Sequence, residues 1–228
     1  MDEEGRVKQV YPRDCKDLRG NGQCMSGVYE IYLYGSSLGP LQVYCDMKTM
    51  GGGWTVIQKR IDGSLSFDRN WAEFKNGFGS PEQKVWIGND VINQMTKGHN
   101  SSLYVSITLV DRTTLYELYN QFSVFDEAEN YKLFLAGPAT GTLGDRMLST
   151  GLVYRDLSGM PFSTRDRDND RYEGNCAVYA GGGGWWFNDC YFAFLNGRWS
   201  SSDWIYPWYP PVFYSNSIKE IVMMIRRH

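Results

Sequence analysis

The chain has 228 residues, a formal net charge of −3 and a sequence pI of about 5.5. Because no stretch concentrates Lys and Arg, the sequence does not favour a nucleic-acid partner. No apolar run approaches the ~20 residues that a membrane helix needs, so no insertion into a membrane is expected. The start, Met1-Asp2-Glu3-Glu4, does not read as a signal peptide, and we expect the sequence to be a segment of a longer protein.

The composition favours short strands and tight loops, because the sequence contains 25 Gly, 16 Tyr, 11 Phe and 8 Trp. Its five cysteines are Cys15, Cys24, Cys45, Cys176 and Cys190. They form no CxxC pair and only two His accompany them, so a zinc site is not expected. A secreted domain with two disulfides and one remaining cysteine fits better, and Asn100-Ser101-Ser102 would then be a glycosylation acceptor.

The first elements are predicted to be strands. Residues 28–33 and 41–45 alternate as strands around a turn at Gly35-Ser36-Ser37. Three glycines, Gly51–Gly53, mark a tight turn before a strand over 54–60. The N-terminal part of the chain therefore begins a sheet.

The middle of the chain combines two short helices with three strands. Residues 71–78 and 90–96 are predicted to be helical. The alternation of apolar and polar residues over 103–110 predicts a strand, and 113–125 and 131–136 predict two more. These strands would extend the same sheet.

The last third of the chain differs from the rest. From about residue 140, regular periodicity gives way to Gly, Asp, Asn and aromatic residues, which predicts ordered loops. Residues 218–226 then form a closing strand that would return to the sheet. This order predicts a sheet-based region that displays a loop-built region.

The segment Asp166–Cys176 is the most informative stretch of those loops. Its run of Asp and Asn side chains supplies hard oxygen ligands of the kind that Ca²⁺ prefers. An EF-hand is excluded, because the twelfth position is Ala177 instead of the bidentate Glu. A solvated polar turn without a metal is the alternative, since Asp, Asn and Gly favour turns.

A series of ordered motifs identifies a family resemblance from about Cys15 to Arg226. These motifs are Asp14-Cys15, Ser26–Tyr29, Val43–Met47, Gly51–Gln58, Asp62-Gly63-Ser64, Trp86–Asn89, Phe162-Ser163-Thr164, Asp168-Asn169-Asp170, Gly174–Ala177, Gly184-Trp185-Trp186 and Leu195-Asn196-Gly197. Together they resemble the fibrinogen C-terminal domain, whose family includes the chains of fibrinogen, ficolins, tachylectins, angiopoietins and tenascins.

The resemblance implies an α+β fold with a central antiparallel sheet, short helices and a loop-rich C-terminal subregion. We therefore expect a single fibrinogen-like domain over 10–228. Its subregions would be an N-terminal part of about 10–55, a central sheet over 56–150 and a loop-rich part over 151–228.

The resemblance also implies a cysteine pairing that the sequence by itself leaves open. The disulfides would be Cys15–Cys45 and Cys176–Cys190. Cys24 would then be unpaired, and we expect it to be buried and inert, because free Cys is among the most buried residue types. The alternative is that Cys24 links two protomers.

For the metal, the resemblance implies a ligand set of two side chains and two backbone groups. The side chains would be Asp168 and Asp170, and the carbonyls those of Tyr172 and Gly174. Asp166 would support these ligands from outside the coordination shell. The expected cofactor is Ca²⁺, holding the loops that form an adjacent pocket.

Lectin members of the family place an acetyl-binding pocket beside the calcium. The peptide before the second C-terminal cysteine is typically cis there and corresponds to Asp189-Cys190. This sequence departs from the lectin pattern, because Tyr191 stands where those members have His. The segment between Asn196 and Trp208 is also shorter than in ficolins, so the acetyl pocket cannot be copied directly.

A surface of aromatic rings beside polar groups is nevertheless what glycan binding needs. The candidate ligand-binding residues are Tyr179, Asp189, Cys190, Tyr191, Trp204 and Tyr206. The alternative for each aromatic candidate is a place in the core. Trp185, Trp186 and Trp208 match positions found across the family and are assigned to packing.

These observations predict a secreted, extracellular calcium-binding lectin of innate immunity. Its partners would be microbial surface glycans such as peptidoglycan, lipopolysaccharide or acetylated sugars. One alternative is a protein–protein module, either an angiopoietin-like receptor ligand or a fibrin-type polymerisation pocket, and another is a structural matrix module as in tenascins. Fold alone does not separate the three.

Enzymatic activity is not expected. Neither His99 nor His228 lies in a motif that would pair it with a nucleophile. The resemblance further implies that the full-length protein forms a homo-oligomer through a stem upstream of this sequence.

Overall fold

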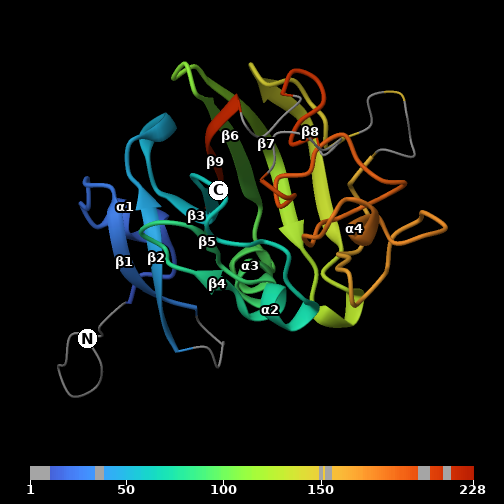
Figure 1. Ribbon diagram of the computed structural model, residues 1–228. Coiled ribbons are helices and arrows are strands. Elements are labelled where there is room, and N and C mark those ends of the chain that lie inside the picture. Colours follow the sequence, from blue (N-terminus) through green and yellow to red (C-terminus); the bar gives the residue numbers. More distant parts are fainter. Residues whose placement is uncertain (1–10, 34–38, 149–150, 152–155, 200–205, 213–216) are drawn as a thin grey trace.

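The computed structural model describes residues 11–33, 39–148, 151, 156–199, 206–212 and 217–228 (Figure 1). One antiparallel sheet runs through the molecule in the order β1-β2-β3-β9-β6-β7-β8, with β5 paired to both β3 and β4. The strands are β1 (Gly27–Tyr32), β2 (Pro40–Asp46), β3 (Trp54–Arg60), β4 (Phe78–Gly79), β5 (Val85–Trp86), β6 (Ser101–Leu109), β7 (Thr114–Val124), β8 (Leu133–Gly141) and β9 (Ile218–Arg227).

The helices are short, and side chains satisfy several of their ends. They are α1 (Cys15–Gly20), η1 (Thr49–Gly51), α2 (Trp71–Asn76), α3 (Asn89–Thr96), η2 (Glu127–Glu129) and α4 (Cys176–Tyr179). Asn70 and Glu73 form a reciprocal capping box at the start of α2, which satisfies two backbone N–H groups that the helix leaves open. No helix in the described part of the chain is long and apolar enough to cross a membrane.

The sheet has an apolar residue set on each face, because side chains alternate along a strand. On β6, Leu103 and Val105 belong to the main core, which also contains residues of α2 and α3. Tyr104 points to the opposite face and joins a smaller cluster with Trp54 and Met224. The main core therefore lies on one side of the sheet.

The C-terminal strand β9 lies inside the sheet, between β3 and β6. It pairs with β3 through contacts such as Thr55 with Ile225, and with β6 through contacts such as Leu103 with Ile225. The last strand in the sequence is thus a central strand in space, so the N-terminal and middle strands form one continuous sheet only once β9 is in place.

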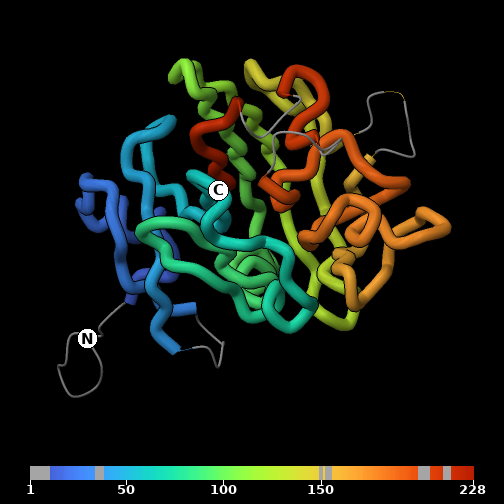
Figure 2. The backbone as a smooth tube through the Cα atoms, in the orientation of Figure 1, coloured from blue at the N-terminus to red at the C-terminus, as the bar shows by residue number. Residues whose placement is uncertain are grey.

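The loop-rich segment, orange in Figure 2, lies beside the β7–β8 side of the sheet. Backbone and side-chain hydrogen bonds hold it there: Trp186 Nε1 donates to the Tyr131 carbonyl (2.8 Å) and Phe162 N to the Asn130 carbonyl (2.9 Å). Between β8 and β9, the described residues contain only the helix α4 and isolated β-bridges. The shape of this segment is therefore set by packing and single hydrogen bonds.

The expectations for the fold and for the disulfides are confirmed. The fold is the expected α+β arrangement, and the disulfides Cys15–Cys45 and Cys176–Cys190 form as the resemblance implied. The expected strands and both expected helices are present, while α1 and α4 were not predicted. The turn expected at Gly35–Ser37 lies outside the described residues.

The prediction that Cys24 is buried is wrong. The sequence favoured a buried, inert thiol, but Cys24 is exposed and its Sγ donates to the Gly22 carbonyl (3.3 Å). The residue lies in the turn between α1 and β1, whose neighbouring residues are exposed as well. Apolar character alone did not bury it.

Candidate functional site

The acidic loop after residue 164 places two carboxylates side by side. Asp168 Oδ1 accepts the N–H of Asp170 (3.2 Å), and Asp170 accepts the N–H of Tyr172 (3.0 Å) and of Cys176 (2.9 Å). Burial and the charge of Asp168 raise the pKa of Asp170 to about 6, although the Cys176 and Tyr172 N–H groups lower it. The loop thus brings the charge of Asp168 close to a second, half-buried carboxylate whose ionisation it opposes.

This geometry fits a cation with a small number of side-chain ligands. In the described part of the chain, no group of three or more His, Cys, Asp or Glu side chains could hold a metal. Asp168 and Asp170 would therefore need backbone oxygens to complete a shell, and the carbonyls of Tyr172 and Gly174 follow in the same loop. Ca²⁺ accepts such a mixed set, because it takes carboxylate, carbonyl and water oxygens in flexible geometry.

Tyr172 connects this loop to a neighbouring aromatic surface. Its ring lies 6.0 Å from the ring of Tyr179 on α4, measured between centroids. A side chain at Gly174 would meet the Tyr172 ring at 3.0 Å, so the glycine allows the ring to lie over the loop. Asn175 caps α4 by accepting the Val178 N–H (2.9 Å), which fixes the direction of the helix after the loop.

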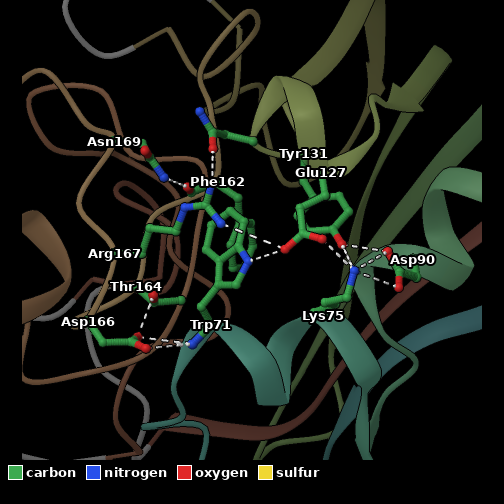
Figure 3. A network of polar contacts seen from close by, with 11 residues as sticks. Trp71, Lys75, Asp90, Glu127, Tyr131, Phe162, Thr164, Asp166, Arg167 and Asn169 are labelled. Carbon is green, nitrogen blue, oxygen red and sulfur yellow. Dashed lines mark hydrogen bonds and ion pairs between the residues drawn. The ribbon is translucent and has the colours of Figure 1, made fainter.

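Asp166 anchors the loop to α2 instead of facing the two carboxylates. Its carboxylate accepts the backbone N–H of Trp71 (3.0 Å), the first residue of the helix, and the hydroxyl of Thr164 (2.7 Å) (Figure 3). Asp166 therefore supports Asp168 by holding the start of the loop, as a group outside a coordination shell would.

Arg167 completes this anchor at the indole ring of Trp71. Its guanidinium lies 4.0 Å from the Trp71 ring centroid, and its Nη2 donates to Asn130 Oδ1 (2.6 Å) (Figure 3). Trp71 Nε1 in turn donates to Glu127 Oε1 (2.8 Å). The acidic loop is thus fixed to the helix α2 and to the turn after β7 just before Asp168 and Asp170.

Beside the loop lies a cavity of about 450 Å³. Its lining residues are Tyr172, Tyr179, Asp189, Cys190, Tyr191, Phe192, Tyr206 and Tyr209. The Asp189–Cys190 peptide is cis, as the resemblance implied. Asn188 joins this segment to the acidic loop, because its carbonyl accepts the N–H of Arg171 (3.1 Å).

Five of the six candidate ligand residues line this one cavity, and the sixth, Trp204, lies outside the described residues. Their exposure differs: Tyr179 is 74% exposed, whereas Tyr191 is 8% exposed and packs against Phe187 and Phe194. Tyr191 thus presents little more than one edge.

Three lining residues were not among the sequence candidates: Tyr172, Phe192 and Tyr209. Tyr172 was predicted only through its carbonyl, and Phe192 follows a candidate directly, so proximity in sequence was the available signal. The tryptophans assigned to packing, Trp185, Trp186 and Trp208, are fully buried. Asn100 is exposed between α3 and β6, and its glycosylation stays a prediction.

With the geometry established, comparison with known proteins defines the class. Residues 11–228 match the family described as "Fibrinogen beta and gamma chains, C-terminal globular domain". The chain belongs to this fibrinogen C-terminal family.

Particular relatives resemble the protein over nearly the whole length of this sequence. Human fibroleukin is 38% identical over 234 residues, which cover 96% of this chain and 52% of fibroleukin, so the chain spans about half the length of this curated relative. The fibrinogen-like globe domain of human ANGPTL2 is 36% identical with a TM-score of 0.84, covering 94% of this chain and 98% of that one. The corresponding domain of human ANGPTL6 is 34% identical with a TM-score of 0.83, covering 97% and 98%.

A third solved structure is described with a ligand. It is lamprey fibrin D-dimer complexed with the peptide Gly-His-Arg-Pro-amide, 31% identical with a TM-score of 0.81, covering 97% of this chain and 75% of that one.

These relatives correct the functional prediction from sequence. The prediction of a lectin for microbial glycans is wrong: the matched proteins are fibroleukin, two ANGPTL globe domains and a fibrin bound to a peptide, which support the protein–protein alternative. The physical reason for the error is that tyrosine rings beside carboxylates suit a peptide as well as a sugar. The prediction gave weight to the acidic loop as a mark of lectins, although that loop contributes only Tyr172 to the lining of the cavity.

Proposed function

We propose that the domain is a protein-recognition module whose tyrosine-lined cavity beside the acidic loop binds a peptide segment of a partner protein. The observation that carries this proposal is the cavity of about 450 Å³, which lies against Asp168–Gly174 and is lined mainly by aromatic side chains. Its size and lining are those of a site that encloses a few side chains.

The charge of the site favours a cationic peptide. Asp189 lines the cavity and is exposed. A free α-amino group or an Arg side chain placed beside this carboxylate and over the faces of Tyr179 and Tyr206 gains both Coulombic and cation–π attraction. The peptide bound to the lamprey fibrin, which carries an Arg residue, has this character.

Calcium has a supporting role in this proposal. Ca²⁺ bound by Asp168 and Asp170 and by the carbonyls of Tyr172 and Gly174 would fix the backbone that carries the Tyr172 ring. The metal would also stabilise the ionised form of Asp170 against its burial and the charge of Asp168, which raise its pKa. The cation therefore orders one wall of the cavity, and the aromatic residues make the contact with the peptide.

An extracellular location accompanies the proposal. Two disulfides join Cys15 to Cys45 and Cys176 to Cys190, and such bonds persist in oxidising compartments. Recognition by binding, without catalysis, would then be the activity of the domain.

The test is a titration of the domain with Gly-His-Arg-Pro-amide in Ca²⁺, monitored by NMR. We expect saturable shifts confined to the cavity residues, and at least tenfold weaker binding after Asp189→Asn or Tyr179→Ala. N-acetylation of the peptide removes its α-amino charge and is expected to weaken binding further.

Tyr11→Ala is the matched control, because Tyr11 is an exposed tyrosine at the N-terminal end of the described residues. A selection from a displayed library of peptides with free N-termini extends the test beyond one sequence. The proposal is overturned if neither the single peptide nor the library gives binding that Asp189→Asn or Tyr179→Ala weakens.

A further inference from the structure

Arg60 is a buried cation with no anion paired to it among the residues that the structure describes. It ends β3 and is 3% exposed. Burial alone acts on its pKa, which falls to about 9, whereas a neighbouring carboxylate would raise that value. Buried charges in proteins are usually paired, so the position of Arg60 needs an explanation.

The hydrogen bonds of Arg60 use one corner of its guanidinium group. Nη1 donates to the carbonyls of Leu195 (2.8 Å) and Gly197 (2.6 Å), which occupies both of its hydrogens. Within the described residues, Nε is buried and has no hydrogen-bond partner. The donors not used by these carbonyls therefore lie along the Nε–Nη2 edge.

Aromatic rings pack against the same group. The guanidinium carbon lies 4.4 Å from the ring centroid of Phe67 and 5.2 Å from that of Trp199. These contacts are cation–π contacts and hold the group in a fixed plane. With the rings in place and Nη1 occupied, the Nε–Nη2 edge is the side of Arg60 whose donors make no hydrogen bond to the described residues.

Arg60, Phe67 and Trp199 all line a cavity of about 360 Å³. The remaining lining residues are Gly63, Leu65, Ser66, Asp68, Gly181, Gly182 and Arg198. The acidic member, Asp68, is already paired with Arg165, whose Nη1 lies 2.9 Å from its Oδ2. The described lining of the cavity thus contains a second arginine and no carboxylate that pairs with Arg60.

In one part of the cavity wall, the backbone of Gly182 packs closely against the side chain of Asp68. Gly182 has a φ of +105°, and a Cβ there would lie 2.5 Å from the Asp68 carboxylate carbon. Only glycine allows this approach without displacing Asp68. The cavity is therefore bounded by a defined surface on this side too.

We propose that this cavity binds a carboxylate group of a partner protein, held by the Nε–Nη2 edge of Arg60. A planar carboxylate matches that edge with two parallel hydrogen bonds. The rings of Phe67 and Trp199 and the side chain of Leu65 accept the methylene groups that precede an acidic group in a peptide. The source is either an acidic side chain or the C-terminus of a polypeptide, which share this chemistry.

The carboxylate site is distinct from the tyrosine-lined cavity and does not depend on it. The short segment after α4 separates the two, because Tyr179 lines one cavity and Gly181 and Gly182 line the other. One partner that presents a basic and an acidic group could contact both cavities at once. Each site is nevertheless testable with its own probe.

The first test is an NMR titration with sodium acetate that follows the Nε–Hε resonance of Arg60. Sodium chloride at equal ionic strength and neutral acetamide are the controls. We expect a saturable shift with acetate only, in the millimolar range typical of a single small anion. The proposal is overturned if acetate moves the resonance no more than chloride does.

A variant pair tests the location without disturbing the guanidinium. Ser66 is an exposed residue of the cavity wall. Ser66→Glu places a negative charge there and is expected to weaken acetate binding about tenfold, whereas the neutral Ser66→Gln changes it less than about twofold. Equal binding by both variants would show that the anion binds elsewhere.

Substitution of the arginine tests the mode of binding. Arg60→Lys keeps a charge but loses the planar fork, so we expect acetate binding to fall by at least tenfold in a folded protein. If this variant does not fold, the Ser66 pair still decides the question, since Ser66 is exposed and outside the core.

Two peptides then separate the sources of the carboxylate. Acetyl-Gly-Gly-Glu-Gly-amide has an acidic side chain only, and acetyl-Gly-Gly-Gly with a free C-terminus has a terminal carboxylate only. A shift of the Arg60 resonance by either one supports the site and identifies its source. If acetate binds but neither peptide does, the assignment to a protein carboxylate is wrong.

Discussion

The sheet and the loop-rich region reach a stable structure by different means. In the sheet, long ladders such as that between β6 and β9 provide hydrogen-bond partners for the backbone N–H and C=O groups, and alternating apolar residues bury one face. Between β8 and β9, the backbone is instead held by isolated bridges, the Cys176–Cys190 disulfide and buried aromatic rings. The tyrosine-lined cavity lies in the second region, where the backbone is free to form cavities because no ladder constrains it.

The largest expected effect comes from removing a ring that joins the two regions. Trp186 is fully buried, contacts Phe162 and donates to the Tyr131 carbonyl. Trp186→Ala leaves a large cavity and is expected to cost about 3–5 kcal/mol in the free energy of unfolding. Urea denaturation monitored by circular dichroism measures this cost.

Leu103→Ala in β6 is the matched substitution within the sheet, because Leu103 is also fully buried. Its expected cost is about 2–5 kcal/mol. The comparison is sharpened if Trp186→Ala also abolishes peptide binding while Leu103→Ala does not. Equal losses of binding at equal stability would contradict a separate role for the loop region.

Removal of the disulfide in the loop region is the next effect in size. Cys176 and Cys190 are 14 residues apart, and the chain-entropy account gives the bond about 3 kcal/mol. The double substitution Cys176→Ser/Cys190→Ser is expected to lose about that amount in thermal or urea unfolding. It should also expose the acidic loop to proteolysis, since Cys176 N binds Asp170.

The corresponding removal of Cys15–Cys45 provides the control in the sheet region. Its separation of 30 residues gives a stabilisation of slightly less than about 4 kcal/mol. We expect this variant to keep the protease resistance of the loop region. Cleavage within residues 164–190 in both variants would show that the two regions unfold together.

Calcium is expected to act on one region only. Ca²⁺ at 100 times its dissociation constant would add about 2.7 kcal/mol to the folded state. Hydrogen exchange with Ca²⁺ and then with a chelator should show loss of protection in Asp168–Cys176 and unchanged protection in β6 and β9. Asp170→Asn should abolish the difference, and a difference that survives this substitution would place the metal elsewhere.

The smallest expected effect is a pH dependence at the junction of the regions. Glu117 on β7 accepts the N–H of Gly144 (2.7 Å), and burial, followed by the charge of Asp145, raises its pKa above the ordinary value of 4.5, although Arg146 and the Gly144 N–H oppose this. The folded state therefore binds a proton more tightly than the unfolded state, so this contribution to stability is lost as pH rises from 4.5 through the folded pKa.

Glu117→Gln removes this titration while keeping an acceptor for Gly144. We expect the variant to lose less stability than the parent protein as the pH rises from about 4.5 towards neutrality. Urea unfolding at several pH values measures the slopes. Parallel slopes for the two proteins would contradict the raised pKa.

The two regions also differ in how far sequence could predict them. Alternation over 103–110 predicted β6 within a residue or two, because the side-chain period of a strand appears directly in the sequence. The helix α4 was not predicted, since four residues capped by Asn175 carry no periodic signal. Its direction follows from a loop that is fixed by Asp166 and Arg167 to residues distant in sequence.

In the candidate site, too, some residues could be predicted from the sequence and others could not. Tyr179, Asp189 and Tyr206 were predicted from their chemistry and do line one cavity. Tyr191 was predicted for the same reason, yet packing against Phe187 and Phe194 buries most of its ring. Arg60 was not predicted, because its burial between Phe67 and Trp199 depends on residues that are distant in sequence.

By itself, the sequence determined the strands, the acidic loop and the family, since these depend on local periodicity and on ordered motifs, whereas the disulfide pairing came only from the family resemblance. The tertiary structure decided which rings are exposed and which are buried, that Cys24 is accessible, and that Arg60 is enclosed with no carboxylate paired to it in the described part of the chain. The physical reason is that burial and pairing depend on residues that are distant in sequence. The sequence specifies which chemical groups are present, and packing decides which of them remain accessible to a ligand.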